Sequence, residues 1–238
     1  MQPLVWDSEF LGFPVARLAG RHLGLADLAV VMDAQRAAGT RLIYLMAEPA
    51  DTETAAAARH AGARLLDRKV TFVQVIGPTE NLNNAHPAAA RVASTVIFTP
   101  QLEALAWQSG EYSRFRLDER FAPLVFPNLY SHWLRASLTG ELTRVVLAAV
   151  APAGEEVGLL TLHEEGGTAS IGLLAVGATM RGRGVGQQLV DAARQQAAAW
   201  GCARLQVVTQ RANAPACGLY TKCGFEAVWE QHVYHLWL

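Results

Sequence analysis

The sequence predicts an α/β protein with two domains, and three observations support this prediction. The 238 residues exceed what a minimal single domain needs, so they form one large domain or two small ones. Hydrophobic residues make up 51% of the chain and charged residues 17%, a composition that excludes a disordered protein. Short apolar runs of strand character alternate with alanine-rich stretches of helical spacing.

The first third of the chain predicts a small β-α-β-α-β unit. Apolar residues at helical spacing precede Gly39, which ends this helix because glycine readily adopts the left-handed conformation of a helix C-terminus. Thr52 can cap a second helix, and Gly62 stops it. The expected elements are a strand at 13–18, a helix at 23–38, a strand at 42–46, a helix at 52–61 and a strand at 65–76.

A domain boundary is expected at residues 77–90, GPTENLNNAHPAAA. Glycine, proline and asparagine are concentrated there, so the segment has little tendency to form a helix or strand. We therefore expect an N-terminal α/β domain at 1–85 and a second domain at 90–238.

The second domain opens with another strand and contains three β-rich runs separated by glycine-containing turns, which predict a meander. Pro127 should kink one expected helix or mark its start. The expected elements are strands at 92–98, 145–150, 157–163, 170–176 and 205–209, helices at 102–109, 121–138, 186–200 and 213–222, a polar loop at 110–121, and two strands within 225–238.

A glycine-rich segment, RGRGVG at 181–186, lies between the strand that ends at Val176 and the helix that starts near Gly186. Its three glycines allow a tight turn with exposed N–H groups, and such a turn at a helix N-terminus binds phosphate. A strand-to-helix turn without a ligand is the alternative. The segment is neither a Walker A motif nor the full G-x-G-x-x-G dinucleotide fingerprint.

A second pattern follows in TQRANAPACGLYTKCGF, where Asn213 and Tyr220 lie two helical turns apart on one face. The two segments together resemble the Gcn5-related N-acetyltransferase (GNAT) superfamily. Its R/Q-x-x-G-x-G/A pattern binds the pyrophosphate of acetyl-coenzyme A, and its N-x-x-A-x-x-x-Y-x-x-x-G-F pattern forms a helix beside the cofactor. The resemblance covers residues 92–238. It implies a mixed, largely antiparallel central sheet flanked by helices.

The resemblance implies roles for particular residues. Tyr220 would be the general acid that protonates the departing sulfur, or else a packing tyrosine. The Val176 N–H would polarise the acetyl carbonyl. Arg181 and Arg183 would bind phosphate or remain solvated, Asn213 would bind the cofactor or cap its own helix, and Lys222 would reach the cofactor or interact with the helix dipole. The expected cofactor-binding residues are Leu174, Ala175, Val176, Arg181, Gly182, Arg183, Gly184, Val185, Gly186, Asn213, Leu219 and Lys222.

A narrower likeness concerns the acceptor. WDSEFLGFPVARL, SRFRLDERF and LYSHWLRASLTGE are similar to segments of acetyltransferases of the TDP-fucosamine type, which acetylate the 4-amino group of a dTDP-4-amino-4,6-dideoxy-hexose. Aromatic rings and fixed positive charge suit a nucleotide diphosphate, although a charged surface loop is the alternative. The expected substrate residues are Tyr112, Arg114, Phe115 and Arg116, with Trp6, Asp7 and Phe10 bordering the pocket or sealing a domain face. The general base is left open among Glu111, Asp118, Glu164 and Glu165, and loss of the amine proton to ordered water is the alternative.

Composition bears on the binding partners, the cellular location and the metal content that we expect of this protein. The net charge of −1 gives no support to a nucleic-acid-binding protein. No apolar run approaches the roughly 20 residues of a membrane span, and the N-terminus lacks a secretory signal, so we expect a cytoplasmic protein. Its three cysteines lack metal-ligand spacing, so we expect neither a metal nor a disulfide. A homodimer is possible.

The expected function is acetyl-coenzyme A-dependent N-acetylation of a nucleotide-linked amino-deoxy sugar in the biosynthesis of a surface glycan such as lipopolysaccharide. An acetyltransferase for a protein N-terminus or a small amine is the alternative enzyme. A non-catalytic acyl-coenzyme A-binding module is the alternative from another class, although Tyr220 beside an intact RGRGVG argues against it.

Overall fold

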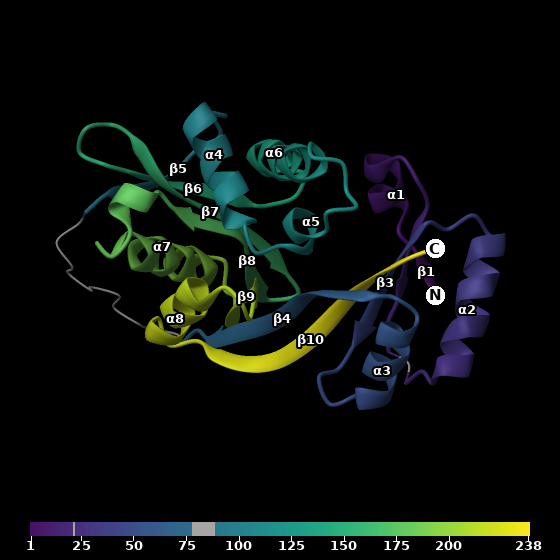
Figure 1. The fold of residues 1–238 in the computed structure, drawn as a ribbon. Coiled ribbons are helices and arrows are strands. Elements are labelled where there is room, and N and C mark those ends of the chain that lie inside the picture. Colours follow the sequence, from purple (N-terminus) through teal and green to yellow (C-terminus); the bar gives the residue numbers. More distant parts are fainter. Residues whose placement is uncertain (21, 78–88) are drawn as a thin grey trace. The chain divides into compact units, whose positions relative to one another are not determined.

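The computed structural model describes residues 1–20, 22–77 and 89–238, which form two compact units (Figure 1). The first unit comprises Met1–Val70, Gln210–Ala212 and Trp229–Leu238, and the second comprises Thr71–Thr209 and Asn213–Val228. Strands β4 (Arg64–Val75) and β10 (Glu226–Trp237) contribute residues to both units. The boundary predicted at 77–90 lies largely outside the described residues.

The first unit is a small sheet with three helices. Strands β2 (Val15–Leu18) and β3 (Leu42–Ala47) are parallel, β1 (Gln2–Pro3) is antiparallel to β2, and the end of β10 is antiparallel to β3. Alternate strand residues such as Ile43, Leu45, Tyr234 and Leu236 join one buried core with residues of the helices. The helices are α1 (Val5–Leu11), α2 (Leu25–Ala37) and α3 (Thr52–His60).

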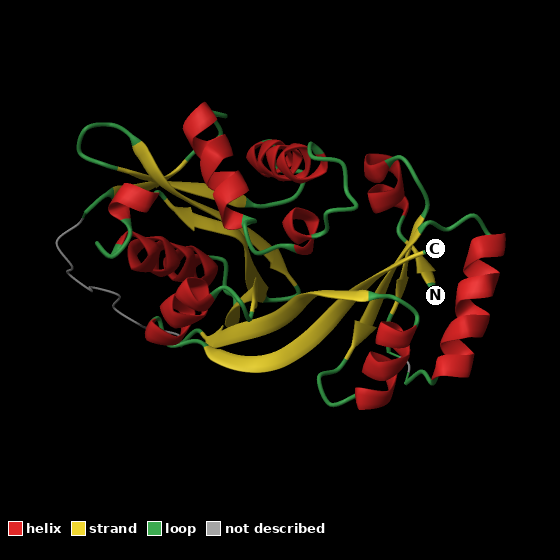
Figure 2. Ribbon diagram, in the orientation of Figure 1, coloured by secondary structure: helices red, strands yellow, loops and turns green. Residues whose placement is uncertain are grey.

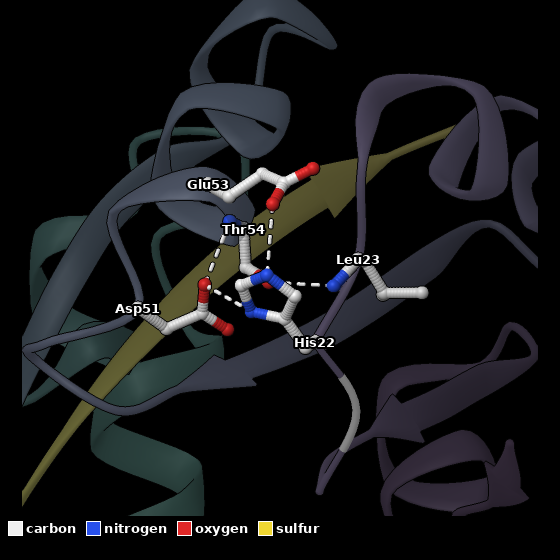
Figure 3. Close-up of polar contacts among 5 residues, drawn as sticks. All are labelled: His22, Leu23, Asp51, Glu53 and Thr54. Carbon is white, nitrogen blue, oxygen red and sulfur yellow. Dashed lines mark hydrogen bonds and ion pairs between the residues drawn. The ribbon is translucent and has the colours of Figure 1, made fainter.

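The N-cap of helix α3 lies one residue earlier than predicted. Asp51, rather than Thr52, is the N-cap, and its carboxylate accepts a 2.9 Å hydrogen bond from the Thr54 N–H. His22 bridges this helix start, since its Nδ1 lies 2.8 Å from Asp51 Oδ1 and its Nε2 lies 2.8 Å from Glu53 Oε2 (Figure 3). The Leu23 N–H donates to the Thr54 hydroxyl at 2.8 Å. These contacts hold the segment before α2 against α3.

The sheet of the second unit has the strand order β4-β9-β8-β7-β6-β5. Its strands β5 to β8 form an antiparallel meander, and β9 is parallel to β8, which confirms the mixed, largely antiparallel sheet (Figure 2). These strands are β5 (Arg91–Ser94), β6 (Val145–Val150), β7 (Glu156–Glu165), β8 (Thr168–Val176) and β9 (Arg204–Gln210).

Helices flank this sheet, with α4 and α6 on one side of the meander and α7 and α8 on the other (Figure 1). The predicted apolar face of α7 is confirmed, because Leu189, Val190, Ala193 and Ala197 are all buried. The helices of the second unit are α4 (Pro100–Ser109), α5 (Arg114–Leu117), α6 (Val125–Leu138), α7 (Val185–Ala199) and α8 (Ala214–Lys222), with a 3-10 turn at Ala178–Met180.

Three local predictions were wrong or incomplete. Residues 226–237 form one strand rather than two, because the segment contains no glycine, proline or asparagine to turn the chain. The polar loop predicted at 110–121 contains the short helix α5. Helix α1 was missed, although Gly12, with a φ of 74°, provides its left-handed C-terminal residue.

Candidate active site

Strands β8 and β9 separate before they end. Their parallel pairing runs from Thr168 opposite Arg204 to Ile171 opposite Val207, although β8 continues to Val176. On its other edge β8 stays paired with β7 as far as Gly158 opposite Val176. The last residues of β8 therefore have a partner strand on one side only.

This separation leaves main-chain groups of β8 facing away from β7. The Gly177 N–H donates to the Val157 carbonyl, so the next pair, Gly158 and Val176, is a non-hydrogen-bonded pair of the antiparallel ladder. The N–H and C=O of Val176 therefore point to the side where the pairing with β9 has ended. The same alternation applies to Leu174, which lies opposite Leu160.

The Val176 carbonyl accepts hydrogen bonds from two side chains. The Gln108 amide donates to it at 2.7 Å and the Arg181 Nε donates to it at 3.1 Å. Gln108 belongs to α4 and Arg181 follows the 3-10 turn. Polar contacts thus join both helix α4 and the segment after the 3-10 turn to the end of β8.

The glycine-rich turn has the geometry that its sequence predicts. Gly182 and Gly184 have φ values of 73° and 82°, a region that residues with a side chain rarely adopt. Gly184 is the N-cap of α7, and the Gln188 N–H makes a bond to the Gly184 carbonyl. The preceding N–H groups, those of residues 185–187, have no acceptor within the helix.

Gly186 contributes close packing rather than an unusual backbone angle. A Cβ atom added at Gly186 would lie 3.2 Å from Leu219 Cδ2 and 3.7 Å from Val176 Cγ2. The absence of a side chain therefore lets the first turn of α7 approach both α8 and the end of β8.

These elements surround a cavity of about 710 Å³, here called the cofactor cavity. Every predicted cofactor-binding residue lines it except Arg183, and the predicted substrate residue Tyr112 lines it as well. Glu111, a candidate general base, lines it too. Sequence reasoning missed several other lining residues, because they are contributed by α4, by the 3-10 turn and by uncharged positions of α7 and α8: Gln108, Ser109, Met180, Gln187, Ala214, Pro215, Ala216 and Gly218.

The lining of the cofactor cavity fits acetyl-coenzyme A. The N-terminal end of α7, together with Arg181 and Lys222, suits phosphate groups. The exposed main chain of β8 can hydrogen-bond the amides of the pantetheine arm. Asn213 caps α8 by accepting a 3.2 Å bond from the Ala216 N–H, and it also lines the cavity, so the capping alternative is confirmed without removing Asn213 from the site.

Tyr220 lies behind the wall of the cavity. Its side chain is 3% exposed and packs against Phe72 and Phe225, with ring centroids 5.8 and 5.7 Å away. Leu219 and Lys222 of the same helix line the cavity, whereas Tyr220 is not among its lining residues. Burial raises the pKa of the Tyr220 hydroxyl, and the neighbouring Cys217 and Cys223 add to this effect. The hydroxyl therefore keeps its proton at neutral pH, as a proton donor must.

A second cavity of about 460 Å³, here called the aromatic cavity, lies beside α4 and α6. Gln108 and Glu111 line both cavities, so the two adjoin. Apolar side chains form much of its wall. The lining residues are Ala104, Trp107, Gln108, Glu111, Arg116, Pro123, Phe126 and Pro127.

The structure does not bring the four predicted substrate residues to one cavity. Arg116 lines the aromatic cavity and Tyr112 the cofactor cavity. Phe115 is 7% exposed and packs against Phe121 and Trp133. The Arg114 guanidinium lies 4.3 Å from the Phe115 ring. In the first unit, Trp6 and Phe10 stack on each other along α1, whose first turn also contains Asp7.

The four carboxylates named as candidate general bases have different surroundings in the structure. Asp118 is 2% exposed and accepts a bond from the Arg120 N–H. Glu164 accepts a bond from the Gly167 N–H and pairs with Arg144, and Glu165 lies opposite Thr168 at the far end of β8 from Val176. Of the four, all of which are described, Glu111 alone lines the two cavities.

Other reactive side chains lie outside this site. Burial raises the pKa of the Cys223 thiol to about 11 and also raises the pKa of Cys202. Within residues 1–20, 22–77 and 89–238, no group of three or more histidine, cysteine, aspartate or glutamate side chains could hold a metal ion.

Comparisons with known proteins agree with this geometry. A model of the acetyltransferase (GNAT) family matches residues 101–225. A dTDP-fucosamine acetyltransferase of Escherichia coli O6:H1 is 27% identical over 94% of this chain and 92% of its own length. A GCN5-related N-acetyltransferase from Kribbella flavida superposes with a TM-score of 0.55 at 15% identity, covering 93% of this chain and 80% of that one.

A second solved structure shares the fold. The GCN5-related N-acetyltransferase from Sphaerobacter thermophilus superposes with a TM-score of 0.54 at 17% identity over 88% of this chain. The match spans 65% of the length of that protein. At such identities, the two solved structures support the fold alone.

Proposed function

Because this chain belongs to the acetyltransferase (GNAT) family and is an N-acetyltransferase, we propose that its acceptor is a nucleotide-linked amino-deoxy sugar of the dTDP-4-amino-4,6-dideoxy-hexose type. The proposal follows the activity for which the dTDP-fucosamine acetyltransferase is named, and this chain is similar to that protein along almost its whole length. A product of this kind belongs to the synthesis of a surface glycan such as lipopolysaccharide.

One observation supports the use of acetyl-coenzyme A as the acetyl donor: the end of β8 and the N-terminus of α7 border a single cavity. Acetyl-coenzyme A supplies the acetyl group as a thioester. Residues 185–187, with Arg181 and Lys222, would hold its phosphates through N–H groups and positive charge. The main chains of Leu174, Ala175 and Val176 would hold its pantetheine arm.

The residues at the end of β8 and on α8 then serve the transfer. The Val176 N–H would donate to the acetyl carbonyl oxygen and stabilise the negative charge that develops there. As the amine nitrogen forms its bond to the carbonyl carbon, the carbon–sulfur bond breaks. Tyr220 would supply the proton that the departing sulfur takes up. Because Tyr220 is buried, this role requires its hydroxyl to reach the cavity in the loaded enzyme.

The cytoplasmic location and the homodimer remain predictions. No helix in the described part of the chain is both long and apolar enough to cross a membrane.

A panel of amines tests the proposed function. The release of coenzyme A is measured with acetyl-coenzyme A and, in turn, dTDP-4-amino-4,6-dideoxy-galactose, the free amino sugar, a peptide with a free N-terminus and a small polyamine. We expect the highest kcat/KM for the nucleotide sugar, because binding of the nucleotide contributes energy that the free sugar lacks.

Two other outcomes would replace the proposal. Equal or higher kcat/KM for the peptide or the polyamine would make this an acetyltransferase for a protein N-terminus or a small amine. Binding of acetyl-coenzyme A without thiol release for any amine would indicate a non-catalytic module.

A further inference from the structure

We propose that the aromatic cavity is the acceptor subsite, that its ligand is an amino sugar esterified to phosphate, and that Glu111 is the residue that binds the reacting amine. This inference rests on the proposed function, because it assigns the place and the groups that would select such an acceptor.

The position of the aromatic cavity supports the first step. It shares Gln108 and Glu111 with the cofactor cavity, so a ligand in one meets a ligand in the other at these two side chains. Gln108 also contacts the carbonyl of Val176, the residue whose N–H would bind the acetyl carbonyl. An amine placed at Glu111 therefore lies on the side of the cofactor cavity where the acetyl group is expected.

The aromatic cavity has a fixed apolar wall. The Trp107 indole N–H donates to the Pro127 carbonyl at 3.1 Å and to the Ser131 hydroxyl at 2.9 Å, which ties α4 to α6 and holds the ring in place. The side chain stays 38% exposed. With its polar atom satisfied, the ring offers an apolar surface, as does Phe126 beside it. Such a wall suits the C–H face and the methyl group of a deoxy sugar.

The charged groups of the aromatic cavity have opposite signs. Glu111 supplies one carboxylate, and Arg116, whose guanidinium carbon lies 5.5 Å from the Phe126 ring centroid, supplies one cation. A sugar that carries both an ammonium group and a phosphate matches this pair, because each of its charges meets a group of opposite sign. A simple amine has no group for Arg116.

The backbone that carries Glu111 is held firmly. A Cβ atom added at Gly110 would lie 2.2 Å from Tyr130 Cζ, so the chain at the end of α4 packs directly on the ring of a buried residue of α6. Glu111 follows at once, with its side chain exposed to both cavities. The close packing of Gly110 on Tyr130 therefore positions the backbone from which the Glu111 side chain extends.

The bonds and protons balance in this arrangement. The ammonium group bound at Glu111 first loses one proton to solvent. The resulting neutral nitrogen forms the bond to the acetyl carbon, the carbon–sulfur bond breaks, and the sulfur takes a proton from Tyr220, which regains one from solvent. The nitrogen releases a proton to the Glu111 carboxylate, which passes it to solvent. Glu111 touches the substrate in this scheme and is a catalytic residue.

Paired variants test the assignment with dTDP-4-amino-4,6-dideoxy-galactose as acceptor. Glu111→Gln keeps the size of the side chain and removes its charge, and we expect kcat/KM for the acceptor to fall about 100-fold or more. Arg116→Ala should raise the acceptor KM by at least about tenfold and reduce the preference for the nucleotide sugar over the free sugar. Glu119→Gln and Arg120→Ala, at exposed neighbouring positions outside both cavities, should retain wild-type kinetics.

Acetyl-coenzyme A binding, measured by calorimetry, shows that each variant is folded and should be unchanged in all four. Wild-type kinetics in Glu111→Gln and Arg116→Ala, with an active wild-type enzyme, would overturn the subsite alone. A wild-type enzyme that does not acetylate the nucleotide sugar would overturn the proposed function, and the subsite with it.

Discussion

The side-chain amide of Gln108 donates a 2.7 Å hydrogen bond to the main-chain carbonyl of Val176. This contact joins helix α4, which contributes to the aromatic cavity, to the strand end that borders the cofactor cavity. It therefore fixes the β8 main chain at the place where the acetyl group is expected.

Replacing Gln108 should weaken cofactor binding. Gln108→Leu keeps much of the volume but removes the donor, and a net hydrogen bond is worth about 1 kcal/mol, so we expect about a fivefold higher Kd for acetyl-coenzyme A. Calorimetry measures this value. Gln101→Leu, at an exposed position in the first turn of α4, is the control. An unchanged Kd in Gln108→Leu would mean that Arg181 alone holds the carbonyl.

Acetyl-coenzyme A should raise the melting temperature of the protein. A ligand at about 100 times its Kd adds about 2.7 kcal/mol to the stability of the folded state. Gly186→Val should abolish this gain by pushing against Leu219, and Gly184→Val should abolish it by straining the turn. Gly154→Val, at a φ of 91° outside the site, should destabilise the free protein but keep the gain. Wild-type protein that melts at the same temperature with saturating acetyl-coenzyme A would refute the cofactor assignment.

Tyr220→Phe should separate catalysis from binding. The variant keeps the ring that packs against Phe72 and Phe225 and removes only the hydroxyl, so folding and acetyl-coenzyme A affinity should persist. Loss of a general acid should lower kcat by about 100-fold to 10,000-fold. Steady-state kinetics with the nucleotide sugar measures this effect, and an unaltered kcat would leave Tyr220 with a packing role.

Arg194 should be a major contributor to the stability of the second unit. This buried cation of α7 donates to Gln74 at 2.9 Å and to the Cys223 carbonyl at 3.0 Å, and it pairs with Asp191 at 3.2 Å. Arg194→Met removes the buried cation and leaves the Asp191 carboxylate, whose side chain is 15% exposed, without this partner, so we expect a loss of about 3 kcal/mol in urea unfolding. Arg204→Met, at an exposed position of β9, should change little. Similar unfolding of the two variants would show that the buried cluster contributes no net stability.

The contribution of His22 should depend on pH. The hydrogen bond to Asp51, and after it the hydrogen bond to Glu53, raise the pKa of His22 above 6.5. The stabilising effect of His22 is therefore complete below pH 6.5, and it is lost as the pH rises through the raised pKa. Relative to wild type, His22→Gln should melt at a lower temperature at about pH 5.5 and at the same temperature at about pH 9. A difference that does not vary with pH would assign the effect to packing.

The cofactor side of the site could be predicted from sequence because its determinants are local. Gly182 and Gly184 impose the turn through their own backbone angles, and Asn213 caps the helix that it begins. A short segment of sequence therefore contains most of the information that specifies each element.

The acceptor side could not be predicted in the same way, because it depends on contacts between distant residues. Trp107 and Phe126 line the same cavity only because α4 packs on α6. Phe115 was expected at the substrate but is buried by Phe121 and Trp133, an outcome that the local pattern SRFRLDERF does not specify. Two final strands were predicted within 225–238 where the structure has one, because no glycine, proline or asparagine within 226–237 marks a turn.

The separation of β8 from β9 also bears on how the enzyme could acquire new acceptors. Main-chain groups at Leu174 and Val176 are the same whatever side chains those positions carry, so the contacts proposed for them with the cofactor would persist through substitution. The side chains that line the proposed acceptor subsite belong to α4, α6 and the segment between them. Evolution can therefore vary the acceptor through one set of residues while the donor stays constant, and an engineer who changes specificity can do the same.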